Sequence, residues 1–179
     1  MPRNTSNSKK QNTVRINAGE WRSRLLKFPD AEGLRPTPER VRQTVFNWLG
    51  QDLTGLNCLD LFAGTGVMGF EALSRNARTA VLVEKTPAAL KADAAKVFNI
   101  DALSFLAHNR ESFEVIFLDP PYNQGWLAKV LPLLPANLSP DGVVYVEAEF
   151  SIEEDATWRV IKQSKAGNVF YHLLKLQPS

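Results

Sequence analysis

The stretch NCLDLFAGTGVMG (57–69) indicates how this chain folds. Its first half is a short apolar run typical of a buried strand, and its second half contains glycines at G-x-G-x-x-G spacing. Glycine permits a tight turn from a strand into a helix and lets a ligand come close to backbone N–H groups. The stretch therefore predicts a strand, a ligand-binding turn and a helix in succession.

The same alternation continues along the chain. Short apolar runs predict further strands, so that the full set is 58–62, 79–84, 97–100, 114–119 and 142–147. Helical periodicity predicts helices over 37–49, 66–74, 87–96 and 126–134. The segments 158–162 and 169–175 predict a terminal antiparallel hairpin. Apolar strands that alternate with helices are typical of a mostly parallel sheet covered on both faces, so the predicted fold class is a doubly wound α/β domain.

The N-terminal part of the chain differs in charge from the rest. The 179-residue chain has a formal net charge of +2, but residues 1–42 carry +6 and residues 43–179 carry −4. We expect a disordered basic tail over 1–13, a small β-hairpin extension over 14–36 and the main domain over 37–179. A basic arm on a mildly acidic body favours a polyanionic partner, although an ordinary solvated tail would give the same pattern.

Composition excludes several classes of protein. The chain is 44% hydrophobic and 22% charged, as is typical of a globular domain. One cysteine, Cys58, and two histidines predict neither a disulfide nor a protein-ligated metal. No apolar run reaches the roughly 18 residues that span a bilayer, and the N-terminus lacks the apolar core of a secretory signal. We expect a cytoplasmic protein with no membrane partner, and we expect it to be a monomer.

Carboxylates lie near the ends of the first two predicted strands of the main domain. Asp60 lies near the end of the first, four residues before Gly64, and Glu84, which is 18 residues beyond Gly66, ends the second. Ligands of a doubly wound sheet bind beyond the carboxyl ends of its strands, where Glu84 could accept hydrogen bonds from two ribose hydroxyls. This arrangement predicts a cofactor that contains a nucleoside. The glycine spacing fits NAD, whereas Asp60 favours a ligand with an ammonium or sulfonium group, such as S-adenosylmethionine.

The sequence DPPY (119–122) follows the fourth predicted strand. Its two prolines fix φ and have no N–H donors, so the turn is rigid and its carbonyls can accept hydrogen bonds. Asp119 adds a side-chain acceptor, and Tyr122 adds a flat ring on which a base can stack. The motif predicts a site for a planar exocyclic amine; the alternative is a rigid turn after a buried strand.

DPPY (119–122) resembles the catalytic motif of S-adenosylmethionine-dependent amino-methyltransferases. Further motifs are RINAGEWR (15–22), LRPTPERVR (34–42), FNWL (46–49), LDLFAGTG (59–66) and EALSR (71–75). Together they resemble the RsmD family of bacterial 16S rRNA (guanine-N2)-methyltransferases, from about residue 14 to 175. The resemblance implies a seven-stranded class I methyltransferase fold with S-adenosylmethionine as cofactor. It also implies methyl transfer to the exocyclic N2 of one guanine in 16S rRNA, in the small ribosomal subunit or an assembly intermediate.

The resemblance also implies roles for individual residues. The expected catalytic positions are Asp119, Pro120, Pro121 and Tyr122. The expected cofactor-binding positions are Asp60, Phe62, Ala63, Gly64, Thr65, Gly66, Glu84, Asp101, Ala102 and Leu103. From their charge, we expect RNA phosphates to be contacted by Arg15, Arg22, Arg24, Lys27, Arg35, Arg40 and Arg42.

Three other functions compete with this interpretation. The first is amino-methyl transfer to another nucleic acid, such as adenine N6 in DNA. The second is an RNA-binding module that holds the cofactor without turnover, which the intact DPPY motif disfavours. The third is an NAD-dependent oxidoreductase, which Asp60 disfavours.

Overall fold

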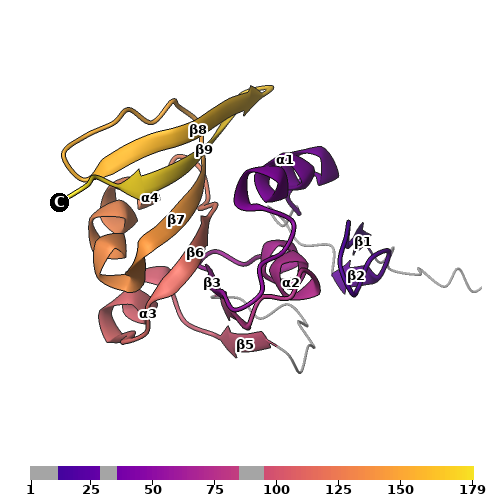
Figure 1. The fold of residues 1–179 in the computed structure, drawn as a ribbon. Coiled ribbons are helices and arrows are strands. Elements are labelled where there is room, and N and C mark those ends of the chain that lie inside the picture. Colours follow the sequence, from indigo (N-terminus) through magenta and orange to yellow (C-terminus); the bar gives the residue numbers. More distant parts are fainter. Residues whose placement is uncertain (1–11, 29–35, 85–94) are drawn as a thin grey trace, which may run out of the picture.

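The central feature of the protein is a seven-stranded sheet with the strand order β5-β4-β3-β6-β7-β9-β8. The structure is a computed structural model that describes residues 12–28, 36–84 and 95–179 (Figure 1). The strands are β3 (Asn57–Asp60), β4 (Thr79–Val83), β5 (Ala95–Phe98), β6 (Phe113–Leu118), β7 (Leu138–Ala148), β8 (Trp158–Ala166) and β9 (Val169–Leu176). Strands β3 to β7 pair in parallel, and β9 pairs antiparallel with both β7 and β8. The predicted doubly wound sheet with an antiparallel C-terminal hairpin is confirmed.

Helices cover both faces of this sheet, as Figure 1 shows. Helices α1 (Glu39–Leu49) and α2 (Val67–Ser74) contribute to buried clusters on one face, and α3 (Ala102–His108) and α4 (Trp126–Val130) to the cluster on the other. In β6, Phe117 belongs to the cluster with α1, whereas Leu118 belongs to the cluster with α3. Successive strand residues point to opposite faces, so a strand covered on both faces is apolar throughout.

Three elements differ in type from the predicted ones, and β7 and β8 are longer than predicted. Strand β5 begins at Ala95, so the last two positions of the helix predicted over 87–96 belong to a strand. The first eight positions of that predicted helix lie outside the described residues. Helix α3 has no counterpart in the prediction. The helix predicted over 126–134 is an α-helix only in α4 and continues as a 3₁₀ helix, η1 (Leu131–Asn137), because Pro132 and Pro135 lack the N–H that an α-helix needs. No helix within the described ranges is long and apolar enough to cross a membrane.

The predicted N-terminal hairpin is formed by β1 (Asn12–Arg15) and β2 (Leu25–Phe28), which pair antiparallel. Asn12 and Thr13, which we expected in the disordered tail, therefore belong to β1. Residues 1–11 of that tail lie outside the described residues.

Residues between β1 and β2 bind the C-terminal end of α2. The backbone oxygen of Ser74 accepts a hydrogen bond from the N–H of Glu20 at 2.8 Å. The Ser74 hydroxyl accepts a hydrogen bond from the N–H of Trp21 at 2.9 Å and donates one to the Ala18 carbonyl at 2.6 Å. These bonds join the hairpin to the helix that follows the glycine turn.

A buried ion network joins α1 to α2. Glu71 Oε1 lies 2.9 Å from Arg42 Nη1, and Glu71 Oε2 lies 3.2 Å from Arg75 Nε. The Glu71, Arg42 and Arg75 side chains are 0%, 2% and 3% exposed. Arg42 also donates to the backbone oxygens of Thr37 and Arg15. The expectation that Arg42 contacts RNA phosphates is wrong, because its guanidinium is buried and bonded within the protein.

The close contact of Gly19 with α2 gives a first prediction. A Cβ at Gly19 would overlap the backbone oxygen of Ser74, whereas a Cβ at Gly55 would have no heavy atom within 4 Å. Their φ angles are similar, at +88° and +82°. We expect Gly19→Ala to lower the free energy of unfolding in urea by about 3 kcal/mol or more, because the hairpin must move away from α2. Gly55→Ala carries only the backbone strain and should cost about 1–2 kcal/mol; equal losses would contradict the packing.

Candidate active site

Four acidic side chains lie at the carboxyl edge of the sheet. Asp60 is the last residue of β3, Glu84 follows β4, Asp119 follows β6, and Glu147 lies near the end of β7. The carboxyl ends of parallel neighbouring strands meet at one edge. Burial raises the pKa of Asp60 most, and the negative charges of Asp119 and Glu84 add to this rise. The fold thus brings together acids that are far apart in the sequence.

The turn after β3 is held against the end of β4. The N–H of Ala63 donates to the Val83 carbonyl at 2.9 Å, and the N–H of Gly64 donates to Glu84 Oε2 at 2.7 Å. Gly64 and Gly66 have φ values of 53° and 79°, in the left-handed region where a side chain is strained. The two glycines are therefore needed for the path of the turn itself.

Asp60 is the most buried acid on the β3 side of this edge, at 5% exposure. Its Oδ2 accepts a hydrogen bond from the N–H of Gly69 at 3.3 Å. Burial raises the pKa of Asp60 to about 7; the Gly69 bond opposes this rise, and the charges of Asp119 and Glu84 add to it. A cationic ligand beside Asp60 would reverse the rise by stabilising the carboxylate.

The other expected cofactor residues lie around this turn and at the start of α3. Ala63 and Thr65 are buried, and the partly buried ring of Phe62 packs edge-on against Trp126 with 5.3 Å between the centroids. Ala102 is buried in the first turn of α3, beside partly buried Leu103.

Asp101 is the N-cap of α3. Its two carboxylate oxygens accept hydrogen bonds from the N–H and hydroxyl of Ser104, at 2.9 and 2.8 Å. These bonds hold the pKa of Asp101 below its usual value. The sequence signal for α3, an acid three residues before a serine at the start of an apolar run, is present but short.

The DPPY turn at the end of β6 contains both buried and exposed side chains. Pro120 is buried, Pro121 is exposed, and the Tyr122 ring is 41% exposed. The next residue, Asn123, has a φ of 60° and donates its N–H to Glu149 Oε1 at 2.8 Å. Burial raises the pKa of Tyr122 to about 12, with further contributions from nearby carboxylates. The tyrosine therefore stays a neutral, partly exposed ring next to Asp119.

Glu147 is a functional candidate that the sequence analysis missed. Its carboxyl is hydrogen-bonded to that of Asp119, and burial together with the charge of Asp119 raises the pKa of Glu147 to about 10. Glu147 sits inside the apolar run of β7, and only the pairing of β6 with β7 shows that it faces Asp119.

The expected RNA-binding residues divide into three groups. Exposed positions on the N-terminal hairpin and on α1 are Arg15, Arg22, Arg24, Lys27 and Arg40. Arg42 is buried, as described above. Arg35 lies outside the described residues.

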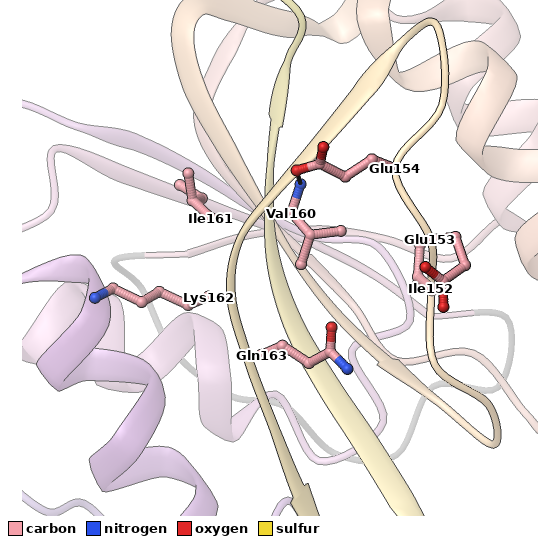
Figure 2. Close-up of a pocket in the computed structure, with 7 residues that line it drawn as sticks. All are labelled: Ile152, Glu153, Glu154, Val160, Ile161, Lys162 and Gln163. Carbon is pink, nitrogen blue, oxygen red and sulfur yellow. Dashed lines mark hydrogen bonds between the residues drawn. The ribbon is translucent and has the colours of Figure 1, made fainter.

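A separate pocket of about 330 Å³ lies between β8 and the segment that follows β7 (Figure 2). The N–H of Val160 donates to Glu154 Oε1 in this pocket, at 3.0 Å. Its lining residues are Ile152, Glu153, Glu154, Val160, Ile161, Lys162 and Gln163. None of the acids or glycines of the carboxyl edge lines this pocket. We place the candidate active site at the carboxyl edge, because the acids and the glycine turn meet there.

The strand order, the glycine turn after β3 and the acids at the carboxyl edge define a class I methyltransferase fold. The structure titled "Crystal structure of SMU.776, a putative methyltransferase complexed with SAH" has the same fold: the TM-score is 0.68 at 14% identity, over 93% of this chain and 56% of that chain.

More similar proteins identify the family. Residues 14–175 match the family described as "Conserved hypothetical protein 95". The chain is 42% identical over 177 residues to "Ribosomal RNA small subunit methyltransferase D" of Escherichia coli K12, covering 89% of this chain and 88% of the relative. The structure titled "Putative methyltransferase yhhF from Escherichia coli" superposes with a TM-score of 0.81 at 39% identity, over 94% of this chain and 100% of that one. The chain belongs to the RsmD family of methyltransferases.

Proposed function

We propose that this protein is an S-adenosylmethionine-dependent methyltransferase that transfers one methyl group to N2 of a guanine in 16S rRNA. The observation that carries the proposal is the convergence of Asp60, Glu84 and Asp119 beside the exposed ring of Tyr122 at one sheet edge. The name of the E. coli relative supports small-subunit ribosomal RNA as the substrate. The choice of guanine N2 rests on the amine-binding character of the DPPY turn and on the family resemblance. We place this activity in the cytoplasm.

The acids at the carboxyl edge fit a cationic cofactor. S-adenosylmethionine carries an ammonium and a sulfonium, and the carboxyl groups of Asp60, Glu84 and Asp119 at this edge can stabilise such positive charges. Asp60 and the glycine turn would hold the methionine part, and Glu84 the ribose. Bound there, S-adenosylmethionine supplies an electrophilic methyl group.

The adenine would lie near Asp101, Ala102 and Leu103. Both oxygens of Asp101 already accept hydrogen bonds from Ser104, but a carboxylate oxygen has two lone pairs and can accept a second bond. An adenine amine could therefore share an acceptor with the helix cap.

The raised pKa of Asp60 predicts a pH-dependent affinity. Only the Asp60 carboxylate can pair with the cofactor's ammonium, and this form is gained as the pH rises through about 7. We expect calorimetry to give about tenfold weaker binding of S-adenosylmethionine near pH 6 than near pH 8. Asp60→Asn should bind weakly at both pH values, without this dependence. Asp101→Asn is the matched control: the pKa of Asp101 is already low, so the pH dependence should persist. If the pH dependence of affinity persisted in Asp60→Asn, another titrating group would be its cause.

Asp119 and Pro120 would orient the target amine. An exocyclic amine on a purine is a poor nucleophile, because its lone pair is delocalised into the ring. The Asp119 carboxylate and the Pro120 carbonyl would accept hydrogen bonds from its two protons and so direct the lone pair. Asp119 then takes the proton that the nitrogen loses after methylation. Such positioning is worth about 7–11 kcal/mol in favourable cases, and Tyr122 would stack on the base once it leaves its own stack.

The exposed basic residues of the hairpin and α1 are proposed to contact RNA phosphates. Phosphate contacts give affinity and salt dependence, and base contacts give specificity. The hairpin is hydrogen-bonded to the C-terminal end of α2, which begins at the glycine turn, so RNA held by the hairpin would lie about one α2 length, roughly 12 Å, from the cofactor site.

Salt dependence tests this role of the hairpin. Arg22 and Lys27 are exposed on the hairpin, whereas Lys129 lies on α4, which covers the opposite face of the sheet from α1 and α2. We expect R22Q/K27Q to lower the slope of log affinity against log salt by about 0.7 for each phosphate that the variant no longer binds. K129Q should leave the slope unchanged. A filter-binding titration of 16S rRNA at several salt concentrations measures both, and an unchanged slope in R22Q/K27Q would remove the hairpin from the RNA interface.

A substrate panel tests the proposed function. We expect labelled methyl groups to pass from S-adenosylmethionine to unmodified small ribosomal subunits or free 16S rRNA, but not to DNA. Label on DNA alone would support the adenine N6 alternative. Cofactor binding without label on any nucleic acid would support a binding module instead.

A further inference from the structure

Glu147 is a buried carboxyl group that the proposed mechanism does not use. It lies near the end of β7 and is 5% exposed. A buried carboxyl without a role in packing or ion pairing is costly, because ionisation in an apolar environment is strongly disfavoured. Its position next to Asp119, the proposed catalytic carboxylate, therefore needs an explanation.

The strand register places Glu147 beside Asp119. Phe117 of β6 and Tyr145 of β7 are register partners, and their rings lie 6.4 Å apart in the cluster on the α1 face. Side chains two positions apart in a strand point to the same face. Asp119 and Glu147, two positions beyond these partners, are thus neighbours on that face, and their carboxyl groups are hydrogen-bonded to each other.

The groups around this pair are acidic or phenolic. Tyr145 lies on the same strand face, Tyr171 of β9 is the register partner of Glu147, and Tyr122 lies in the DPPY turn. The charges of Glu147 and Asp119 act on both Tyr122 and Tyr145 and raise their pKa values, in addition to burial. Glu149, two residues beyond Glu147, accepts the N–H of Asn123 and also acts on Tyr122.

Two carboxyl groups that share a hydrogen bond must hold at least one proton between them. Burial, followed by the charge of Asp119, raises the pKa of Glu147 to about 10, which favours its protonated form. Burial also raises the pKa of Asp119, but the bond from Glu147 lowers it. Asp119 is partly exposed, whereas Glu147 is 5% exposed, so burial disfavours a charge on Glu147 more strongly. This difference in burial makes Glu147 the donor and the Asp119 carboxylate the acceptor.

We propose that Glu147 is a positioning residue for Asp119: its protonated carboxyl donates a hydrogen bond that keeps Asp119 ionised and directed toward the target amine. Glu149 acts at the other end of the same turn, through the N–H of Asn123. The segment EAE (147–149) thus supports the DPPY turn at two points. This inference rests on the proposed function, because it assigns a role in amine methylation to Asp119.

The kcat of variants against pH, at saturating cofactor, tests the proposal, since kcat reports ionisations within the bound complex. Glu147→Gln keeps a neutral donor and should retain kcat within about threefold of the wild type. The acidic limb of its profile of kcat against pH should lie at the same pH as in the wild type. Glu147→Leu removes the donor, so the pKa of Asp119 rises and the acidic limb moves to higher pH. Its kcat should fall about tenfold or more at neutral pH and recover as the pH rises. Glu153→Gln, the same change at an exposed position, should match the wild type.

Two outcomes would overturn the proposal. One is a Glu147→Gln variant as impaired as Glu147→Leu. The other is a Glu147→Leu profile lowered equally at every pH, as a purely structural role would give.

A direct titration separates this proposal from the proposed function. Carbon-13 NMR of protein labelled at the Asp and Glu carboxyl groups reports the protonation state of each carboxyl group as the pH changes, without any RNA. The variants Asp119→Asn and Glu147→Gln assign the two signals. We expect Glu147 of the wild type to remain protonated at neutral pH while Asp119 is ionised. An ionised Glu147 at neutral pH would disprove the assignment even if methyl transfer is demonstrated. A protonated Glu147 would uphold the paired carboxyl groups even if no RNA is methylated.

Discussion

Asp119→Ala is expected to lower the rate of methyl transfer at least about 10³-fold, while the affinity for S-adenosylmethionine changes by no more than a few-fold. The variant removes both the acceptor that orients the amine and the base that takes its proton, and the general-base role alone contributes about 10²–10⁴-fold in other enzymes. Cofactor affinity should survive because Asp60, Glu84 and the glycine turn remain intact. Single-turnover transfer and calorimetry measure the two quantities separately.

Two further variants sharpen this test. Asp119→Asn keeps an oxygen acceptor but has no charge to take a proton, so its rate should lie between those of the wild type and Asp119→Ala. Asp141→Ala removes an exposed acid of β7 and should leave transfer unchanged. If Asp119→Ala instead lost cofactor binding in proportion to activity, Asp119 would be a cofactor residue and the proposed amine site would be wrong.

Glu71→Ala is expected to lower the free energy of unfolding by about 3–5 kcal/mol. The change leaves the guanidinium groups of Arg42 and Arg75 buried without a counter-charge. It also removes the acceptor of the Asn17 N–H, which lies between β1 and β2. For a domain of this size such a loss corresponds to a fall in Tm of roughly 10 °C, which calorimetry measures.

The control for this prediction is Glu153→Ala, which truncates an exposed glutamate and should cost less than about 0.5 kcal/mol. Glu71→Gln should lie between the two, because its amide oxygen still accepts from one arginine. A Tm for Glu71→Ala within a degree or two of the wild type would mean that water or another acid satisfies both arginines.

Much of the fold can be predicted from the sequence, because the strands that decide it have simple patterns. Strands β3, β4 and β6 are covered on both faces, so each appears as a mostly apolar run. Helix α3 could not be predicted in the same way: it has only seven residues, too few for a clear helical period. The 3₁₀ helix over Leu131–Asn137 depends on two prolines whose local effect overrides the apolar spacing around them.

The site was partly predictable for a related reason. Acids that directly follow strands of a parallel sheet must meet at its carboxyl edge, which places Asp60, Glu84 and Asp119 together without any structure. Glu147 lies inside a strand, so its meeting with Asp119 depends on how β6 and β7 are aligned. Arg42 resembles the exposed arginines near it in the sequence, and only its contact with Glu71, 29 residues away, shows that it is buried.

The identity of the methylated nucleoside tests the central claim most directly. After reaction of the wild-type protein with unmodified small ribosomal subunits, the rRNA is digested to nucleosides and analysed by mass spectrometry against synthetic standards. The account predicts N2-methylguanosine, from a single rRNA position, that is absent when Asp119→Ala is used. A methyl group on adenine N6, or on any atom other than guanine N2, would contradict it.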